Sequence, residues 1–167
     1  IVLSPILVIV SILIKLESKG PIIFKQLRAG KGSKPFYIYK FRSMKIETPN
    51  IATNDFTDSH VYITRIGKII RKTSIDEIPQ LFNILKGDMS IVGPRPVILE
   101  EVDLIELRKS YNIDKILPGI TGWAQINGRN SITWTEKFNL DVWYVKNRSF
   151  LLDLKIIFLT VKKVIIK

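Results

Sequence analysis

The chain begins with an uncharged and mostly aliphatic segment, residues 1–14. Because an α-helix rises about 1.5 Å per residue, a helix of this length reaches roughly 20 Å, less than the roughly 30 Å thickness of a bilayer core. Pro5 removes a backbone donor and bends a helix, and Ser4 could bond the carbonyl that the bend frees. The pattern predicts a bent helix that enters one leaflet and returns, with a buried core helix as the alternative.

The residues at either end of this segment indicate whether it belongs to a longer protein or to a signal peptide. Residue 1 is isoleucine, so we expect the chain to begin inside a longer protein. The tail of a signal peptide fits poorly, because the charged residues 15–19 follow and no small-residue cleavage site is present.

Two short runs rich in aromatic and β-branched residues follow, Ile22–Leu27 and Phe36–Arg42, with a glycine-containing turn at 30–34. They predict an antiparallel β-hairpin. Alternation along the second strand places Lys40 and Arg42 on an otherwise apolar face. A cation there either extends to water or meets a fixed anion, and a lysine on a wet edge strand is the bland alternative.

Residues 46–60 are polar, and we predict a loop in which His60, the only histidine, is not a ligand. Helical spacing then appears at 65–72, where the cations share one face. This basic amphipathic stretch suits a membrane surface, with a solvated helix face as the alternative. The cations on that face are Arg65, Lys68 and Lys72.

The next predicted helix starts with Asp76 as its N-cap and ends at Gly87. With this cap, Pro79 lies at the third helical position, where no backbone hydrogen bond is lost. With Ser74 as the cap, one bond is lost, although Ser74 and Glu77 fit the capping box.

The pattern of the C-terminal half predicts a helix at 97–111 and a shaped loop or hairpin, not a helix, in the glycine-rich stretch 117–130. Helical spacing returns at 134–146, and the residues expected inside are Trp134, Phe138 and Val145.

The final segment, 150–167, predicts a basic amphipathic helix suited to an anionic surface, with core packing as the alternative. Its apolar positions include Leu151, Leu154, Phe158, Val161 and Ile165.

Composition narrows the function classes. The 167 residues suffice for one domain with a real core, and the absence of cysteine excludes disulfides and thiolate metal sites. Lys and Arg outnumber Asp and Glu by 26 to 15, a formal charge of +11. This excess favours polyanionic partners such as nucleic acid, anionic lipid or nucleotide phosphates, and charge alone does not choose among them.

The most informative local feature is the acid pair Asp76 and Glu77, which follows the basic run 65–72. Acids in a first helical turn often only offset the helix dipole. Arg95, however, lies between two prolines that limit its backbone, so its planar guanidinium is presented for two-point phosphate binding at little ordering cost. A salt bridge from Arg95 to Asp88 is the alternative. Acids among fixed cations favour chemistry on a phosphate, with a metal or bound anion.

Two further residues are candidates on weaker grounds. Arg129 supplies another cation in the glycine-rich stretch, where backbone can approach a ligand closely, or it belongs to a packed surface loop. Asp141 lies among large apolar residues on the helix at 134–146, where a surface carboxylate is the commoner case.

Taken in order, the motifs resemble the bacterial sugar transferases, the monotopic polyprenyl-phosphate phosphoglycosyl transferases, and the chain's size resembles their minimal members. The resemblance covers nearly the whole chain. It is carried by residues 20–26, 38–44, 71–81, 85–96, 118–129 and 140–145.

The resemblance implies transfer of a sugar-1-phosphate from a UDP-sugar to undecaprenyl phosphate with release of UMP, the first membrane step of bacterial glycoconjugate synthesis. It implies that Asp76 forms a phosphosugar–aspartate intermediate and that Glu77, alone or together with Asp76, holds Mg²⁺. Cations and metal would screen the charge that otherwise repels a carboxylate from a diphosphate. The implied substrate-binding residues are Lys40, Arg71, Arg95, Arg129 and Asp141.

The expected fold is α+β, mostly helical with a short antiparallel β-hairpin, in a monotopic membrane protein with amphipathic surface helices. The resemblance matches Ser4 and Pro5 to the break of a re-entrant helix. The expected divisions are a membrane-embedded helix at 1–18, a catalytic domain at 19–149 and an amphipathic helix at 150–167. We expect the protein at the cytoplasmic face of the bacterial inner membrane.

The expected partners are a UDP-sugar, undecaprenyl phosphate and anionic lipids, not nucleic acid, and self-association stays open. Two alternatives remain: direct attack by the lipid phosphate with Asp76 only binding metal, or a basic, non-enzymatic binder of membrane or nucleic acid. The sequence chooses neither the UDP-sugar nor the glycoconjugate pathway.

Overall fold

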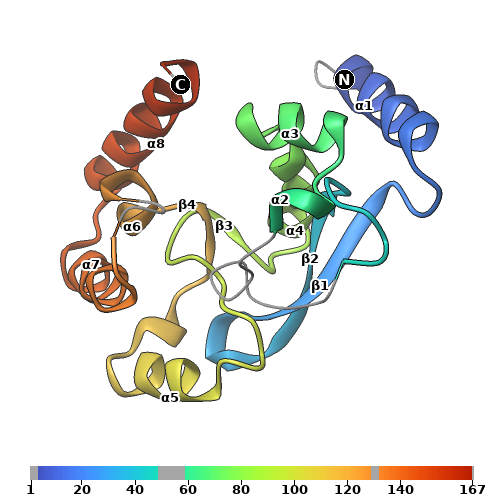
Figure 1. Cartoon of the computed structure of the whole chain (residues 1–167). Coiled ribbons are helices and arrows are strands. Elements are labelled where there is room, and N and C mark those ends of the chain that lie inside the picture. Colours follow the sequence, from blue (N-terminus) through green and yellow to red (C-terminus); the bar gives the residue numbers. More distant parts are fainter. Residues whose placement is uncertain (1–3, 49–58, 129–131, 167) are drawn as a thin grey trace. The chain divides into compact units, whose positions relative to one another are not determined.

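The computed structural model describes residues 4–48, 59–128 and 132–166, which are mostly helical, as the sequence predicted (Figure 1). The chain divides into two compact units. The first comprises Ile1–Lys25 and Tyr39–Pro79, and the second Gln26–Ile38 and Gln80–Lys167.

The predicted hairpin is present. Strand β1 (Ile23–Ala29) pairs with β2 (Pro35–Phe41), and a single 3₁₀ turn, η1 (Lys31–Ser33), connects them (Figure 1). The Gly30 amide donates to the Lys34 carbonyl at 2.8 Å and closes the turn. Both strands differ from the predicted ranges only at their ends, where pairing is least determined by the alternation of side chains.

In the first unit, the apolar helix α1 (Ser4–Glu17) packs against α3 (Arg65–Lys72). Glu17 joins the two helices, because its carboxylate accepts hydrogen bonds from the Arg65 and Ile66 amides at 2.6 and 2.9 Å. These amides belong to the first turn of α3 and have no intrahelical partner. The buried side chains of this unit's core cluster are Val10, Ile14, Phe41 and Ile70.

A buried arginine closes the C-terminal end of α1. Arg42 is 5% exposed, and its guanidinium donates to the carbonyl oxygens of Ser18 at 2.7 Å and Lys19 at 2.9 Å. The expectation that Arg42 reaches water or an anion was therefore wrong. A helix end presents unpaired carbonyls and the negative end of its dipole, which together satisfy a buried guanidinium without a carboxylate.

Pro79 determines how the chain continues after Ser74, whose φ is +57°. A 3₁₀ helix, η2 (Ile75–Gln80), contains Asp76, and the regular helix α4 (Leu81–Leu85) begins only after it. The prediction that Asp76 caps an α-helix was wrong. Tighter i→i+3 turns carry the chain through the proline, which has no amide hydrogen to donate.

In the second unit, β3 (Ser90–Val92) and β4 (Gly119–Thr121) pair in parallel, and α6 (Trp123–Asn127) follows at once. The expectation of a loop or hairpin without helix at 117–130 was wrong. A three-residue strand and a five-residue helix are too short for hydrophobic periodicity to reveal.

The close pairing of this small sheet depends on glycine. A Cβ atom on Gly119 would lie 2.1 Å from the Gly93 amide nitrogen, a distance that no side chain tolerates. Gly119 therefore serves backbone packing, whereas the sequence left open whether the glycines of this stretch approach a ligand or form a packed surface loop.

Helices α7 (Trp134–Asn147) and α8 (Phe150–Ile165) end the chain. The predicted helix at 134–146 is confirmed, and so is the burial of Phe138. Trp134 was expected inside but is 47% exposed, while Tyr144 is buried instead. The core cluster of this unit comprises Val92, Ile126, Tyr144 and Ile156.

The apolar stripe predicted for the last helix lies on its outer side. Phe158 is 70% exposed, whereas Ile156 on the opposite side is fully buried. Core packing is therefore excluded for the stripe, and its use as a surface for lipid stays a prediction. Its exposed members are Leu151, Leu154, Phe158 and Val161.

The remaining helical elements are short. The predicted helix at 97–111 is present only as α5 (Val102–Ser110). Its start is delayed because the Val97 carbonyl accepts a hydrogen bond from Ala29 and Ile98 bridges to Arg28. Within the described residues, no helix combines the length and apolar character needed to cross a bilayer. The other short elements are α2 (Ser59–Tyr62) and η3 (Ile113–Lys115).

Candidate active site

The first unit brings together four of the predicted site residues, which we call the Asp76 cluster: Lys40, Arg71, Asp76 and Glu77. Lys40 comes from β2, Arg71 from the last turn of α3, and the two acids from η2. All four side chains are partly buried. The cluster therefore combines two acids with two cations in a partly water-excluded place.

Lys40 forms the direct ion pair of this cluster. Its Nζ donates to Glu77 Oε1 at 2.8 Å. The sequence-based expectation that a cation on this strand face meets a fixed anion is confirmed for Lys40. The pair neutralises the acid next to Asp76, and it fixes that acid against a strand.

Burial raises the pKa of Asp76 above its ordinary 3.8, and the neighbouring charge of Glu77 adds to the effect. The positive charges of Lys40 and Arg71 act in the opposite direction on the same pKa. The negative charge of Asp76 is thus costly at this position, and further positive charge would favour its ionised, nucleophilic form.

The donor set of the cluster can be tested for magnesium. Among the residues that the structure describes, no three His, Asp or Glu side chains gather to form a metal site. Asp76 and Glu77 nevertheless provide adjacent carboxylates, and Mg²⁺ in phosphate-handling sites commonly has one or two carboxylate ligands with phosphate oxygens and water. These two residues therefore fit a magnesium ion that is bound together with a phosphate.

In the second unit, Asp141 occupies a buried position on α7. It is 3% exposed, and its Oδ2 lies 2.6 Å from Arg108 Nη2. Burial raises the pKa of Asp141 to about 6, although the charge of Arg108 opposes the shift. Asp141 is therefore not the solvated surface carboxylate that is most common on a helix.

Arg108 links Asp141 to the Pro94-Arg95-Pro96 segment. A second nitrogen of the same guanidinium, Nη1, donates to the Arg95 carbonyl at 2.8 Å. Arg108 was not predicted from the sequence, since an arginine on a helix without buried residues such as α5 has no local pattern that marks it. Its two partners are distant in sequence, so only the fold shows the connection.

The backbone around Arg95 is held by further hydrogen bonds. The Gly119 amide donates to the Pro94 carbonyl at 3.0 Å, and Arg28 Nη1 donates to the Pro96 carbonyl at 3.3 Å. Asp88, which we considered as a salt-bridge partner of Arg95, instead pairs with Lys86 at 3.0 Å. Hydrogen bonds to its backbone carbonyls thus hold the Pro94-Arg95-Pro96 segment in place.

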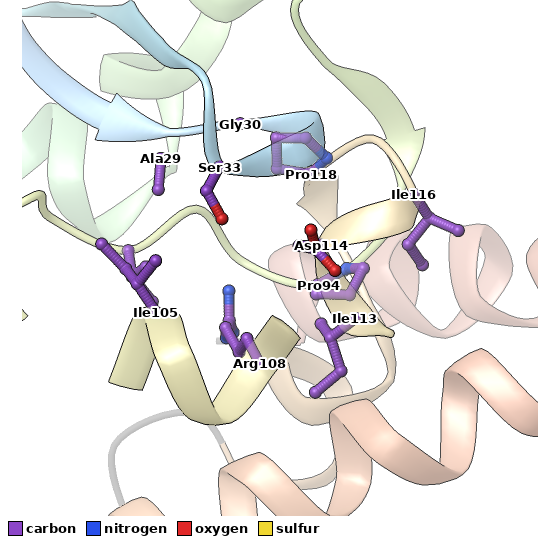
Figure 2. A pocket seen from close by; sticks show the side chains of 11 residues that line it. Ala29, Gly30, Ser33, Pro94, Ile105, Arg108, Ile113, Asp114, Ile116 and Pro118 are labelled. Atoms are coloured by element: carbon purple, nitrogen blue, oxygen red, sulfur yellow. The ribbon is translucent and has the colours of Figure 1, made fainter. Parts of the chain in front are cut away.

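A small cavity of about 20 Å³ adjoins this segment, with Arg108 from α5 and Ser33 from the hairpin turn pointing into it (Figure 2). Ligand pockets for molecules of drug size are on the order of 300–1,000 Å³. At about 20 Å³ this cavity is too small to hold a substrate of that size.

The other predicted site residues are less informative. Arg129 lies outside the described residues. Ser4 and Pro5 are the first residues of α1 that the structure describes, since residues 1–3 lie outside the described part of the chain. The predicted bend at these two residues stays a prediction.

Comparisons with known proteins agree with the motifs. The family model described as bacterial sugar transferase matches residues 1–167. Over 163 residues the chain is 49% identical to the uncharacterized sugar transferase EpsL of Bacillus subtilis, and the match covers 98% of this chain and 79% of that protein. The chain therefore belongs to the bacterial sugar transferase family.

Several relatives have names that state a reaction. Over 170 residues the chain is 43% identical to the UDP-glucose:undecaprenyl-phosphate glucose-1-phosphate transferase of Klebsiella pneumoniae, covering 98% of the chain and 37% of that protein. It is 41% identical over 167 residues to the UDP-N-acetylgalactosamine-undecaprenyl-phosphate N-acetylgalactosaminephosphotransferase of Aeromonas hydrophila, covering 97% of the chain and 40% of that protein. The chain spans about two fifths of the length of these two relatives.

Proposed function

We propose that this protein transfers a sugar-1-phosphate from a UDP-sugar to undecaprenyl phosphate and releases UMP. The names of the two longer relatives support a reaction of this type. The observation that carries the proposal is the Asp76 cluster, in which a partly buried acid with a raised pKa lies under the influence of two cations and a second acid. Such an arrangement suits a nucleophile that must approach a negatively charged diphosphate.

In the proposed reaction, a carboxylate oxygen of Asp76 attacks the β-phosphorus of the UDP-sugar. The bond from this phosphorus to the bridging oxygen breaks, and UMP leaves with that oxygen and its electron pair. An oxygen of undecaprenyl phosphate then attacks the same phosphorus, and Asp76 departs as a carboxylate. A single phosphorus thus exchanges one oxygen partner in each step.

The cations of the cluster have a defined task in this scheme. Lys40 neutralises Glu77, and Arg71 reduces the electrostatic cost of ionising Asp76. Glu77 and Asp76 are the residues that would hold Mg²⁺, which supplies charge neutralisation to the diphosphate when bound.

Direct attack by the lipid phosphate is the second candidate, and one observation favours it. Burial raises the pKa of Asp76, so its ionised, nucleophilic form carries an energetic cost at this position. Under direct attack, Asp76 would only contribute to binding, and no covalent adduct would form.

Intact-protein mass measured after incubation with the UDP-sugar alone separates the two candidates. The covalent route predicts an increase by one sugar phosphate that is absent in Asp76→Asn. The exposed Asp103→Asn provides a matched control and is expected to keep the adduct. Turnover of the wild type without any adduct in rapidly quenched samples would favour direct attack instead. UMP release measured over a panel of UDP-sugars would identify the donor.

We further propose a monotopic location at the cytoplasmic face of the inner membrane, with Ser4 and Pro5 at the re-entrant break. Two features support this, each within its own unit. Helix α1 carries exposed aliphatic side chains beyond those that pack in the core, and α8 carries the exposed apolar stripe beside lysines. Apolar side chains flanked by cations suit the interface of an anionic bilayer.

A further inference from the structure

The hydrogen bonds at the end of β1 single out an arginine that neither the motif analysis nor the comparisons assign to the site. Arg28 forms an antiparallel bridge with Ile98, and the next residue, Ala29, donates its amide to the Val97 carbonyl at 2.9 Å. These contacts fix the backbone of Arg28 against the chain that leaves the Pro94-Arg95-Pro96 segment.

The guanidinium of Arg28 is also fixed. Its Nε and Nη2 both donate to Gln26 Oε1, at 3.1 and 2.6 Å, and its Nη1 donates to the Pro96 carbonyl at 3.3 Å. A guanidinium carries five N–H groups. Within the described part of the chain, these three bonds leave one hydrogen on each terminal nitrogen for another acceptor. The guanidinium of Arg28 is therefore held in one orientation, with part of its hydrogen-bonding capacity left for a ligand.

The charges around Arg28 indicate what that acceptor is. Burial lowers the pKa of Arg28 to about 10, and the charge of Arg95 is the largest single electrostatic contribution in the same direction. Glu101 and Glu100 act in the opposite direction but are not within ion-pair distance of Arg28 among the described residues. Two arginines that repel each other on fixed backbone are stabilised by an anion that contacts both.

We propose that Arg28 and Arg95 together form a phosphate-binding site, with Arg28 as a substrate-binding residue. This proposal rests on the proposed function, in which two phosphate groups reach the protein, the diphosphate of the UDP-sugar and the phosphate of the lipid. Both present the oxygens that a guanidinium binds at two points. The Pro96 carbonyl, held by Arg28 itself, connects the position of one arginine to the backbone of the other.

Equilibrium binding of inorganic pyrophosphate to the full chain tests the site without turnover. Because charge-assisted hydrogen bonds are strong, we expect Arg28→Gln to weaken pyrophosphate binding by about tenfold or more, and Arg28→Lys to have a smaller effect. Lys31→Gln removes an exposed cation from the adjacent turn and is the matched control for net charge. Equal dissociation constants for Arg28→Gln and Lys31→Gln would overturn the proposal.

A second variant distinguishes a role of Arg28 in anion binding from a role in supporting the fold. Gln26→Ala leaves the charge of Arg28 in place but removes the acceptor that orients it, so we expect intermediate weakening of pyrophosphate binding. A thermal midpoint that falls in Arg28→Lys and Gln26→Ala while pyrophosphate affinity stays unchanged would mean that Arg28 only supports the fold, and would overturn the site.

Kinetics then identify the source of the phosphate. In Arg28→Lys, a raised KM for the UDP-sugar with an unchanged KM for undecaprenyl phosphate assigns the site to the nucleotide, and the reverse assigns it to the lipid. If the wild type binds pyrophosphate through Arg28 but releases no UMP from any UDP-sugar, the anion site stands and the proposed reaction fails. If UMP is released and Arg28 variants bind and react as the wild type does, only the site fails.

Discussion

Lys40 Nζ lies 2.8 Å from Glu77 Oε1, so the cation of a strand neutralises the acid adjacent to Asp76. The pair has a consequence for the titration of Asp76, because the positive charge of Lys40 lowers its pKa while the negative charge of Glu77 raises it. Removing the lysine therefore leaves two carboxyl groups with less compensation.

Substitution of this lysine tests that balance. In Lys40→Met we expect kcat/KM for UMP release to fall on the order of tenfold to a hundredfold, as for loss of one electrostatic contact in an active site. Lys34 is an exposed lysine on the same hairpin, and we expect the Lys34→Met variant to keep a kcat/KM close to that of the wild type. Equal activity of the two variants would contradict a role for Lys40.

The pH dependence of the same variants gives a directional test. If ionised Asp76 is required, activity is lost as pH falls through its pKa, which lies above the ordinary 3.8. Because Lys40 lowers this pKa, its removal moves the acidic limb of the kcat/KM profile to higher pH. A limb that stays in place, or moves to lower pH, would show that another group controls it.

Arg108 and Asp141 are expected to act as one unit that positions Arg95. Arg108→Met removes both the 2.6 Å contact with Asp141 and the 2.8 Å bond to the Arg95 carbonyl. We predict that Arg108→Met, Asp141→Asn and the double variant lower kcat/KM by similar factors, since residues that act together are non-additive. Additive losses, measured in the same release assay, would separate their roles.

The buried carboxyl of Asp141 predicts a pH dependence of stability. Its pKa is raised from 3.8 to about 6 in the folded protein, so between these values the folded state binds this proton more tightly than the unfolded chain. The corresponding stabilisation is present below about pH 4 and is lost as pH rises through about 6, roughly 3 kcal/mol in all.

Urea unfolding of the wild type and of Asp141→Asn between pH 4 and pH 7 measures this contribution. The variant cannot ionise at this position, so the difference in unfolding free energy between the two proteins should change over that range. A difference that is constant with pH would exclude the shift.

A glycine at the end of α1 is expected to be essential for stability. Gly20 has a φ of +117°, and a Cβ atom there would lie 2.3 Å from Arg42 Nη1. Gly20→Ala should therefore lower the free energy of unfolding by about 2 kcal/mol or more. Gly32 has a φ of +65° and nothing within 4 Å of a Cβ, so it is a positive-φ glycine without a clash, and Gly32→Ala should lower the free energy of unfolding by only about 1 kcal/mol. Similar losses would argue against the clash.

The apolar stripe of α8 predicts membrane association that can be weakened without unfolding the protein. Leu154→Ser with Phe158→Ser replaces two exposed side chains, so the thermal midpoint should hardly change. Cosedimentation with vesicles that contain anionic lipid should fall, because each substitution removes apolar side-chain area that would enter the membrane interface. Unchanged cosedimentation would assign membrane binding elsewhere.

Local signals in the sequence explain what could be predicted. The hairpin and α7 have clear periodicity, and the adjacent acids and proline-flanked arginine are visible without a fold. The parallel pair β3–β4 could not be predicted, since each strand has only three residues. The same holds for side chains whose partners are distant in sequence, namely Arg42 with the end of α1, and Arg108 with Asp141.

Strand β2 carries Lys40, and Arg42 follows two residues later, directly after the strand end. Lys40 donates to Glu77, the acid beside Asp76, and Arg42 donates to the carbonyl of Ser18, which directly follows α1. The two-residue spacing of Lys40 and Arg42 thus connects the position of α1 to the position of the Asp76 cluster. Under the proposed monotopic location, a bilayer that displaces α1 would therefore act on the proposed nucleophile through the backbone between Lys40 and Arg42.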